Sequence, residues 1–90
     1  MEIKRNDNRF YLEENGEFLG EMTFVPSGED KIIIDHTYVP DKFGGRGYGK
    51  ILLKEIVNYA RENNKKILAT CSYALYQLNK TDEYDDGFIK

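Results

Sequence analysis

The sequence predicts an α+β fold: a mixed, mostly antiparallel sheet with a main helix after a glycine-rich loop and a shorter C-terminal helix. Residues 9–39 contain alternating or β-branched runs, and residues 47–62 repeat apolar positions at three- and four-residue spacings. The first pattern is typical of strands and the second of a helix. A cluster of glycines separates them. Ninety residues are enough for one small domain, so we expect residues 1–90 to form a single unit.

The first half of the chain predicts three strands. Residues 9–13 and 18–25 flank Asn15-Gly16, a dipeptide that tolerates the positive φ of a tight hairpin turn. Residues 31–39 include three consecutive isoleucines, which suits a central strand covered on both faces. In the second strand, the expected faces are Phe18, Gly20, Met22 and Phe24 on one side, with Leu19, Glu21, Thr23 and Val25 on the other.

The second half predicts helix, strand and helix. The main helix, residues 47–62, carries an apolar stripe and stops at Asn63-Asn64. Residues 66–70 form a short strand, joined to the third strand through the helix as in a parallel crossover. Ser72 is the expected N-cap of a second helix that reaches Lys80.

Composition limits the kinds of partner. The net charge is −3, which argues against a general nucleic-acid binder, since that function needs a basic face. No segment has the roughly 20 apolar residues of a membrane span, and the first residues do not resemble a signal peptide. One cysteine cannot form an internal disulfide, so a cytoplasmic protein is expected. A domain this small is expected to be a monomer or a weak dimer paired through an exposed sheet edge.

The segment before the main helix is the most informative part of the sequence. It reads Gly44-Gly45-Arg46-Gly47-Tyr48-Gly49, and its glycines let a ligand approach the backbone because no Cβ intervenes. The first turn of a helix leaves N–H groups unpaired, and the helix dipole adds roughly half a positive charge there. We therefore expect residues 44–50 to bind a phosphate or pyrophosphate, with Lys42, Arg46 and Lys50 adding positive charge.

Two familiar phosphate-binding motifs come close to this segment without matching it. Gly44, Gly49 and Lys50 have the spacing of a nucleotide-binding P-loop, but Ile51 stands where a Ser or Thr must hold magnesium. The dinucleotide fingerprint fails because Lys50 replaces its third glycine. The remaining alternative is a flexible loop with a glycine-assisted turn and no ligand.

These residues resemble the signature of the GNAT acetyltransferase superfamily, Arg/Gln-x-x-Gly-x-Gly/Ala, which lies between a central strand and a helix. Gly47 and Gly49 match its second half, whereas Gly44 stands in place of Arg or Gln. The chain is also similar, over nearly its whole length, to the small single-domain Yjdj-like branch. That similarity is carried by Asp35-His36-Thr37-x-Val39-Pro40, the glycine loop, Cys71-Ser72-Tyr73 and Glu83-Tyr84.

The resemblance implies an acetyl-CoA-dependent N-acetyltransferase that uses no metal. In the superfamily the backbone of the central strand pairs with the pantetheine amides of acetyl-CoA, and the glycine loop holds the pyrophosphate. Most members transfer acetyl directly to an amine after a base removes its proton. The implied cofactor-binding residues are Tyr38, Val39, Gly44, Gly45, Arg46, Gly47, Tyr48, Gly49 and Lys50.

Cys71 and His36 are the candidate catalytic residues. The Yjdj-like branch implies a cysteine near the thioester, and Cys71 precedes a helix start, where a thiolate is stabilised. The alternative is a small cysteine that closes the core. His36, the only histidine, is a candidate base or proton relay, or else a hydrogen-bonded structural residue. Tyr73 and Tyr76 belong to the core or rim, or protonate the leaving thiolate as a tyrosine does in the superfamily.

Three functions stay open on the sequence. The first is acetyl transfer to an amine, through an acetyl-cysteine or a cysteine-assisted step. The second is a non-catalytic acyl-CoA-binding module or sensor, because the chain lacks the extra helices that usually shape an acceptor site in this superfamily. The third is a small interaction domain without a ligand. Protein lysine, polyamine and small metabolite amine are all open as acceptors, and acidic residues 82–86 either attract an amine or form a solvated tail.

Overall fold

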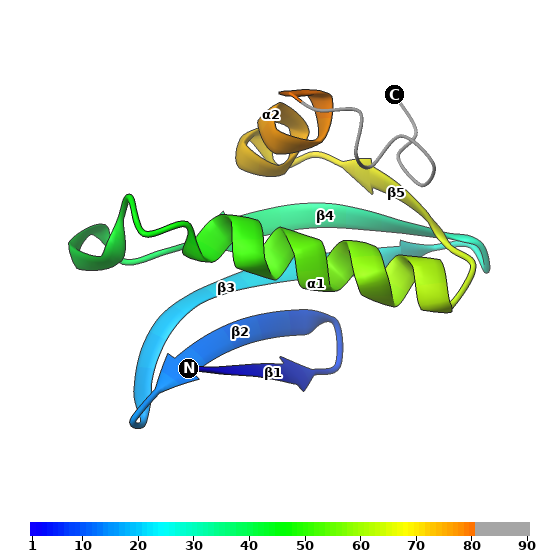
Figure 1. Cartoon of the computed structure of the whole chain (residues 1–90). Coiled ribbons are helices and arrows are strands. Elements are labelled where there is room, and N and C mark those ends of the chain that lie inside the picture. The colour runs from blue at the N-terminus through cyan, green and yellow to red at the C-terminus, as the bar shows by residue number, and fades with distance from the viewer. Residues whose placement is uncertain (81–90) are drawn as a thin grey trace.

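The computed structural model describes residues 1–80, which form a five-stranded sheet with two α-helices (Figure 1). The α+β class and the positions of both predicted helices are confirmed. The elements are β1 (Glu2–Asn6), β2 (Arg9–Glu14), β3 (Glu17–Ser27), β4 (Lys31–Tyr38), the 3-10 helix η1 (Asp41–Phe43), α1 (Tyr48–Glu62), β5 (Lys66–Ala69) and α2 (Ser72–Lys80).

The strands lie in chain order across the sheet. β1 to β4 pair antiparallel with their neighbours, and β5 runs parallel to β4, so the crossover through α1 is confirmed. α1 packs against one face of the sheet (Figure 1). There its apolar stripe meets the inward side chains of the strands. The core they form is made of Phe10, Leu12, Leu19, Met22, Phe24, Ile32, Ile34, Phe43, Leu52, Leu53, Ile56, Val57, Ala60, Ile67, Ala74 and Leu78.

Local sequence signals explain where the elements turn and stop. Asn15 and Gly16 both have positive φ, 51° and 81°, as the hairpin prediction requires. α1 ends because Asn64 adopts the left-handed conformation, φ 55°. The N–H of Asn64 bonds to the carbonyl of Arg61 at 3.3 Å, and that of Lys65 to Ala60 at 2.8 Å, which closes the last turn as a Schellman motif.

The prediction of two strand faces in β3 was wrong for Phe18 and Leu19. The register shifts between Leu12 and Glu13, because Leu12 pairs with Gly20 while Glu13 pairs with Phe18. Leu19 is therefore the extra residue of a β-bulge and turns into the core, whereas Phe18 lies on the opposite face.

Three other expectations need correction. β1 was not predicted, because all five of its residues are exposed and give no apolar pattern. Within residues 1–80, the strand of isoleucines is fully covered on one face, whereas on the other face Ile33 is half-buried and Asp35 and His36 are exposed. α2 begins at Ser72 itself, and the carbonyl of Cys71 accepts a bond from Leu75 at 3.0 Å, so Cys71 takes the N-cap position.

The acidic residues 82–86 and the pair Glu83-Tyr84 lie outside the described residues. Within residues 1–80, neither helix combines the length and hydropathy that a membrane crossing requires.

Candidate functional site

The candidate site lies where β4 and β5 separate. Their parallel pairing ends at Ile34 and Ala69. The N–H groups of Thr70 and Cys71 then both bond to the carbonyl of Ile34, at 2.9 and 3.3 Å, and the chain turns into α2. β4 stays paired with β3 as far as Tyr38, but no described strand pairs with its other side beyond Ile34, so that side borders a gap.

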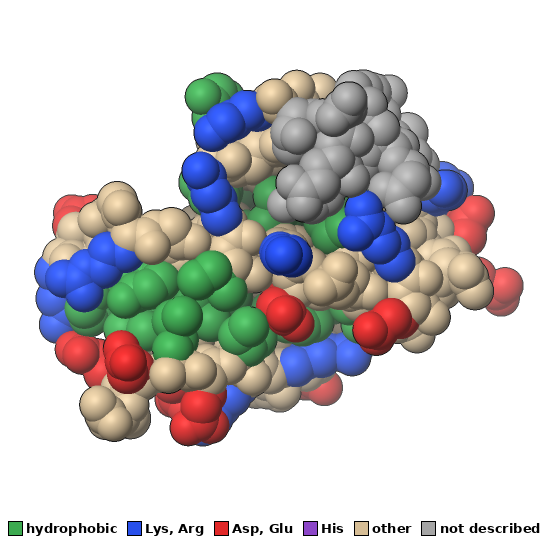
Figure 2. Space-filling model, in the orientation of Figure 1, with side chains coloured by type: hydrophobic (Ala, Val, Ile, Leu, Met, Phe, Trp, Pro, Cys, Tyr) green, Lys and Arg blue, Asp and Glu red, His purple; other side chains and the backbone are tan. Residues whose placement is uncertain are grey.

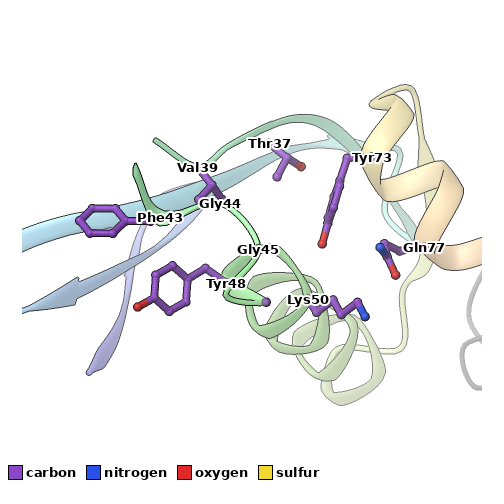
Figure 3. A pocket seen from close by; sticks show the side chains of 11 residues that line it. Thr37, Val39, Phe43, Gly44, Gly45, Tyr48, Lys50, Tyr73 and Gln77 are labelled. Carbon is purple, nitrogen blue, oxygen red and sulfur yellow. The ribbon is translucent and has the colours of Figure 1, made fainter. Parts of the chain in front are cut away.

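A cavity of about 490 Å³ occupies this gap. One wall is β4, the second is the start of α1 with the loop before it, and the third is α2 (Figure 3). In Figure 3, Tyr73 and Gln77 project from α2 toward the start of α1. The volume is in the range of ligand sites. The cavity is lined by Thr37, Val39, Phe43, Gly44, Gly45, Gly47, Tyr48, Gly49, Lys50, Tyr73 and Gln77.

The glycine loop exposes the first turn of α1 to the cavity. Gly45 and Gly47 have left-handed φ of 79° and 80°, and Gly47 is the N-cap of α1. The N–H of Ile51 bonds to the carbonyl of Gly47 at 3.2 Å, which is the first bond of the helical ladder. Helix geometry therefore leaves the preceding N–H groups, residues 48–50, without a helical acceptor. This arrangement favours an anion at the mouth of the helix.

The three basic residues near the loop are held differently. Lys50 lines the cavity. The Lys42 ammonium pairs with Glu17 at 3.1 Å, and the Arg46 guanidinium lies 5.3 Å from the centre of the Phe43 ring. Of these cations, Lys50 is therefore the one whose side chain borders the cavity directly.

Gly49 allows α2 to approach α1. A Cβ at Gly49 would stand 2.6 Å from the Tyr73 hydroxyl oxygen and 2.7 Å from Cζ of that ring. The glycine therefore creates the space in which Tyr73 forms the cavity wall. Sequence analysis did not assign Thr37, Phe43 or Gln77 to the site, because single residues on separate elements form no pattern along the chain.

Cys71 is linked to the cavity by a hydrogen bond to Thr37. Its thiol is half-buried and donates a hydrogen bond to Thr37 Oγ1 at 3.3 Å. Thr37 lines the cavity, whereas Cys71 is not one of the lining residues. The thiol therefore lies one side chain away from the space that a ligand would fill.

His36 lies on the other face of the sheet. Successive side chains of a strand point to opposite faces, so His36 points away from Thr37 and the cavity. Its Nε2 is 3.5 Å from Glu21 Oε2, and Glu21 also accepts a bond from Arg9 at 2.6 Å. Tyr38 shares this open face, where its ring stacks on Phe18 with 6.3 Å between centres. The Tyr38 carbonyl points toward β3, 3.2 Å from where a Cβ on Gly20 would stand, so the expected contact of Tyr38 with a ligand in the gap needs correction.

The donor set for a metal is poor in the described part of the chain. Among residues 1–80, no three His, Cys, Asp or Glu side chains are grouped so that they could hold a metal ion. The chemistry of the cavity is instead that of backbone amides, one lysine, hydroxyls and an amide side chain.

A glycine loop at a helix start, beside a strand that parts from its neighbour, defines a site for a ligand with an anionic group. A family model described as GCN5-related N-acetyl-transferase matches residues 9–87. The chain belongs to this family. A comparison with curated proteins finds no matching sequence.

Solved structures agree with this assignment. A GCN5-like protein of Staphylococcus aureus is 46% identical, with a TM-score of 0.83, over 98% of this chain and 87% of that one. The N-acetylglutamate synthase of Neisseria gonorrhoeae, solved with coenzyme A and N-acetyl-glutamate, is 25% identical with a TM-score of 0.64, over 69% of this chain and 15% of that one. A GNAT acetyltransferase of Elizabethkingia anophelis, solved with acetyl-CoA, shares the fold at 22% identity and a TM-score of 0.66, over 80% of this chain and 50% of that one.

Proposed function

We propose that this chain binds acetyl-CoA in the cavity between β4, α1 and α2 and transfers the acetyl group to an amine. The observation that carries the proposal is the first turn of α1, opened by left-handed Gly47, at one end of a cavity bounded by the free side of β4. The pyrophosphate of the cofactor fits residues 44–50, with Lys50 adding charge. Relatives with the same fold hold coenzyme A or acetyl-CoA.

The pantetheine arm would then lie along β4. It carries two amides, and Val39 lines the cavity on the side of β4 where no described strand pairs. The expected contact with Tyr38 does not fit, because the Tyr38 carbonyl points toward β3, 3.2 Å from where a Cβ on Gly20 would stand. This direction takes the thioester from the glycine loop toward Thr37, whose hydroxyl accepts the bond from Cys71. Gln77 and Tyr73 border the same path from α2.

Cys71 is the proposed acetyl carrier. Its sulfur attacks the thioester carbonyl carbon, the bond from that carbon to the sulfur of CoA breaks, and the thiol proton ends on the departing CoA sulfur. The acceptor amine then attacks the acetyl-cysteine, releases the Cys71 thiol and becomes an amide. The thiol must first turn from Thr37 toward the cavity, so the Thr37 hydrogen bond describes the resting position.

Calorimetric titration with coenzyme A tests the binding half of the proposal. We expect saturable binding, with NMR shift changes concentrated in residues 44–50. No binding at millimolar coenzyme A would remove the basis for any acyl-CoA function.

Release of free thiol from acetyl-CoA, with and without an amine, tests turnover. Amine-dependent release supports a transferase. Binding without release on any amine supports the alternative, a non-catalytic acyl-CoA-binding module or sensor.

Mass spectrometry after incubation with acetyl-CoA tests the covalent step. The acetyl group should appear on Cys71 and disappear when an amine is added. Cys71→Ala should bind coenzyme A normally and lose this adduct. Full turnover by Cys71→Ala would contradict the acetyl-cysteine and leave direct transfer to the amine.

A further inference from the structure

β1 forms one edge of the sheet, and no strand among residues 1–80 pairs with its outer side. All five of its residues are exposed, and Figure 1 shows the strand in dark blue at the opposite edge from β5. Such an edge is a template for another strand unless proline, a bulge or unpaired charged side chains, lysine above all, block it. β1 has no proline and no register shift, and its central Lys4 is paired with Glu13 of β2.

The hairpin determines which backbone groups face outward. Asn6 and Arg9 flank a two-residue turn, and the pair that flanks such a turn exchanges both backbone hydrogen bonds. Bonded and non-bonded pairs alternate along an antiparallel ladder. By this alternation the N–H and C=O groups of Ile3 and Arg5 point away from β2, toward the open edge.

Charge selects among the registers in which β1 can pair with a second copy of itself. A two-fold axis at Glu2, Lys4 or Arg5 places each of these residues opposite its own copy, and like charges directly opposite are destabilising. An axis at Ile3 places Glu2 opposite Lys4 of the second copy, and the same pair recurs by symmetry. This register also brings together the outward N–H and C=O groups of the two Ile3 residues.

The Ile3 side chain supplies an apolar contact in the same register. Ile3 is 40% exposed and lies opposite buried Leu12, on the face of the sheet that α1 covers. Next to it on this face, the Arg5 guanidinium lies 4.2 Å from the centre of the Tyr59 ring of α1. Figure 2 shows hydrophobic side chains exposed on this face beside the first half of α1. Pairing about Ile3 would remove both copies of its side chain from water.

We infer that β1 is a self-association surface, through which two copies pair antiparallel about Ile3 and join their sheets into one. Both α1 helices then lie on the same face of the joined sheet. The cavity lies beside β4 and β5, at the far side of each sheet, so both copies keep it open. The inference therefore does not depend on the proposed function.

Sedimentation equilibrium of the full chain from micromolar to millimolar concentration tests the inference. We expect the mass to rise to twice that of the chain, and Ile3→Lys to keep it monomeric. Val25→Lys is the matched control, because Val25 is 41% exposed on the opposite face and should not affect the mass. A wild-type protein that stays monomeric at millimolar concentration would overturn the inference.

A charge exchange tests the register. Glu2→Lys and Lys4→Glu each place like charges opposite one another in their own dimers, so each should dimerise at least about tenfold more weakly than wild type. Mixed in equal amounts, the two variants place opposite charges in both pairs and should form a heterodimer. Glu29→Lys, an exposed change of the same charge, should dimerise as wild type does.

Circular dichroism of each variant establishes that it is folded. Lys4→Glu also loses its ion pair with Glu13 and is the variant most at risk of unfolding. If it unfolds, the dimer affinity of Glu2→Lys compared with that of Glu29→Lys still tests the register. If Ile3→Lys and Glu2→Lys both dimerise as strongly as wild type, the dimer forms through another surface, and the β1 register is refuted.

Discussion

Gly49 has an ordinary backbone conformation, so its importance lies in the space above it. The Tyr73 ring fills that space, at distances that no Cβ could share. We expect Gly49→Ala to displace Tyr73 from the cavity wall. The strain should lower the free energy of unfolding by about 1–3 kcal/mol, as overpacking does. Affinity for coenzyme A should fall at least about tenfold, which corresponds to 1.4 kcal/mol. Urea unfolding and calorimetric titration measure the two effects.

The double variant Gly49→Ala/Tyr73→Ala is the control for this cause. Without the ring, the added methyl group has room, so Gly49→Ala should cost much less stability in the Tyr73→Ala background. Equal costs in both backgrounds would show that the steric explanation is wrong.

Gly47 presents the opposite case, because a side chain there would meet nothing within 4 Å while the backbone is left-handed, φ 80°. Gly47→Ala should therefore lose about 1–2 kcal/mol of stability through backbone strain alone. Gly47→Asn should lose less, since asparagine tolerates this conformation. Coenzyme A affinity should follow the same order, because the loop amides must keep their positions to meet the pyrophosphate. An alanine variant as stable as wild type would contradict this account.

At the scale of the element, α1 offers two lysines one turn apart with different surroundings. Lys50 lines the cavity, whereas Lys54 is exposed beyond it. Lys50→Gln should weaken coenzyme A binding by roughly the 1.5–3 kcal/mol of a lost hydrogen bond to a charged group, more at low salt than at high salt. Lys54→Gln should bind as wild type does. Pantetheine, which lacks the pyrophosphate, should bind both variants equally, and a loss for pantetheine would place Lys50 elsewhere on the ligand.

β4 separates the chemistry of its two faces. Since His36 pairs with Glu21 on the open face, and Thr37 faces the cavity, we expect His36→Gln to leave the pH dependence of turnover unchanged. The measurement is the pH–rate profile of the acetyl transfer with a fixed amine. A lost ionisation near neutral pH would restore His36 as the base that the sequence suggested.

The elements show how far the sequence determines the structure. Asn15-Gly16, Asn63-Asn64 and the stripe of α1 act through local rules, so the hairpin, the helix end and the crossover were predictable. The bulge at Leu19 was not predictable, because it depends on how β3 pairs with β2. It moves Leu19 to the core face, and the alternation of residue types along the sequence gives no sign of it. β1 is stabilised by cross-strand pairing and ion pairs and not by burial. Its sequence therefore shows no apolar pattern that would predict a strand.

The candidate site also contains a part that the sequence predicts and a part that it does not. The glycine loop was predictable because its residues are consecutive and their backbone carries the chemistry. Tyr73 and Thr37 meet the loop only through tertiary packing, so their spacing in the sequence says nothing about the cavity they share. The one local sign was Gly49, a helical glycine whose missing side chain makes room for a neighbour.

For the whole molecule, the cavity lies between two helices that contact different parts of the sheet. α2 contacts β4 and β5, whereas α1 also contacts β2 and β3. A cofactor held between the two helices would therefore couple α2 to the rest of the fold. Amide hydrogen exchange in α2 should slow on adding coenzyme A, more than exchange in β2 or β3. Equal slowing throughout would indicate global stabilisation without this coupling.

The stability of the whole chain should also report the ligand. A ligand that binds only the folded state adds about 2.7 kcal/mol at a hundred times its dissociation constant. For a domain of this size, each 1 kcal/mol raises Tm by roughly 4–8 °C, so saturating coenzyme A should raise Tm by about 10–20 °C. Adenosine diphosphate shares the pyrophosphate but lacks the pantetheine, and it should give a smaller rise.

Scans at several protein concentrations separate this effect from self-association, because a β1 dimer makes Tm depend on protein concentration whether or not the cavity is filled. An unchanged Tm with coenzyme A at every protein concentration would mean that the cavity does not hold the cofactor.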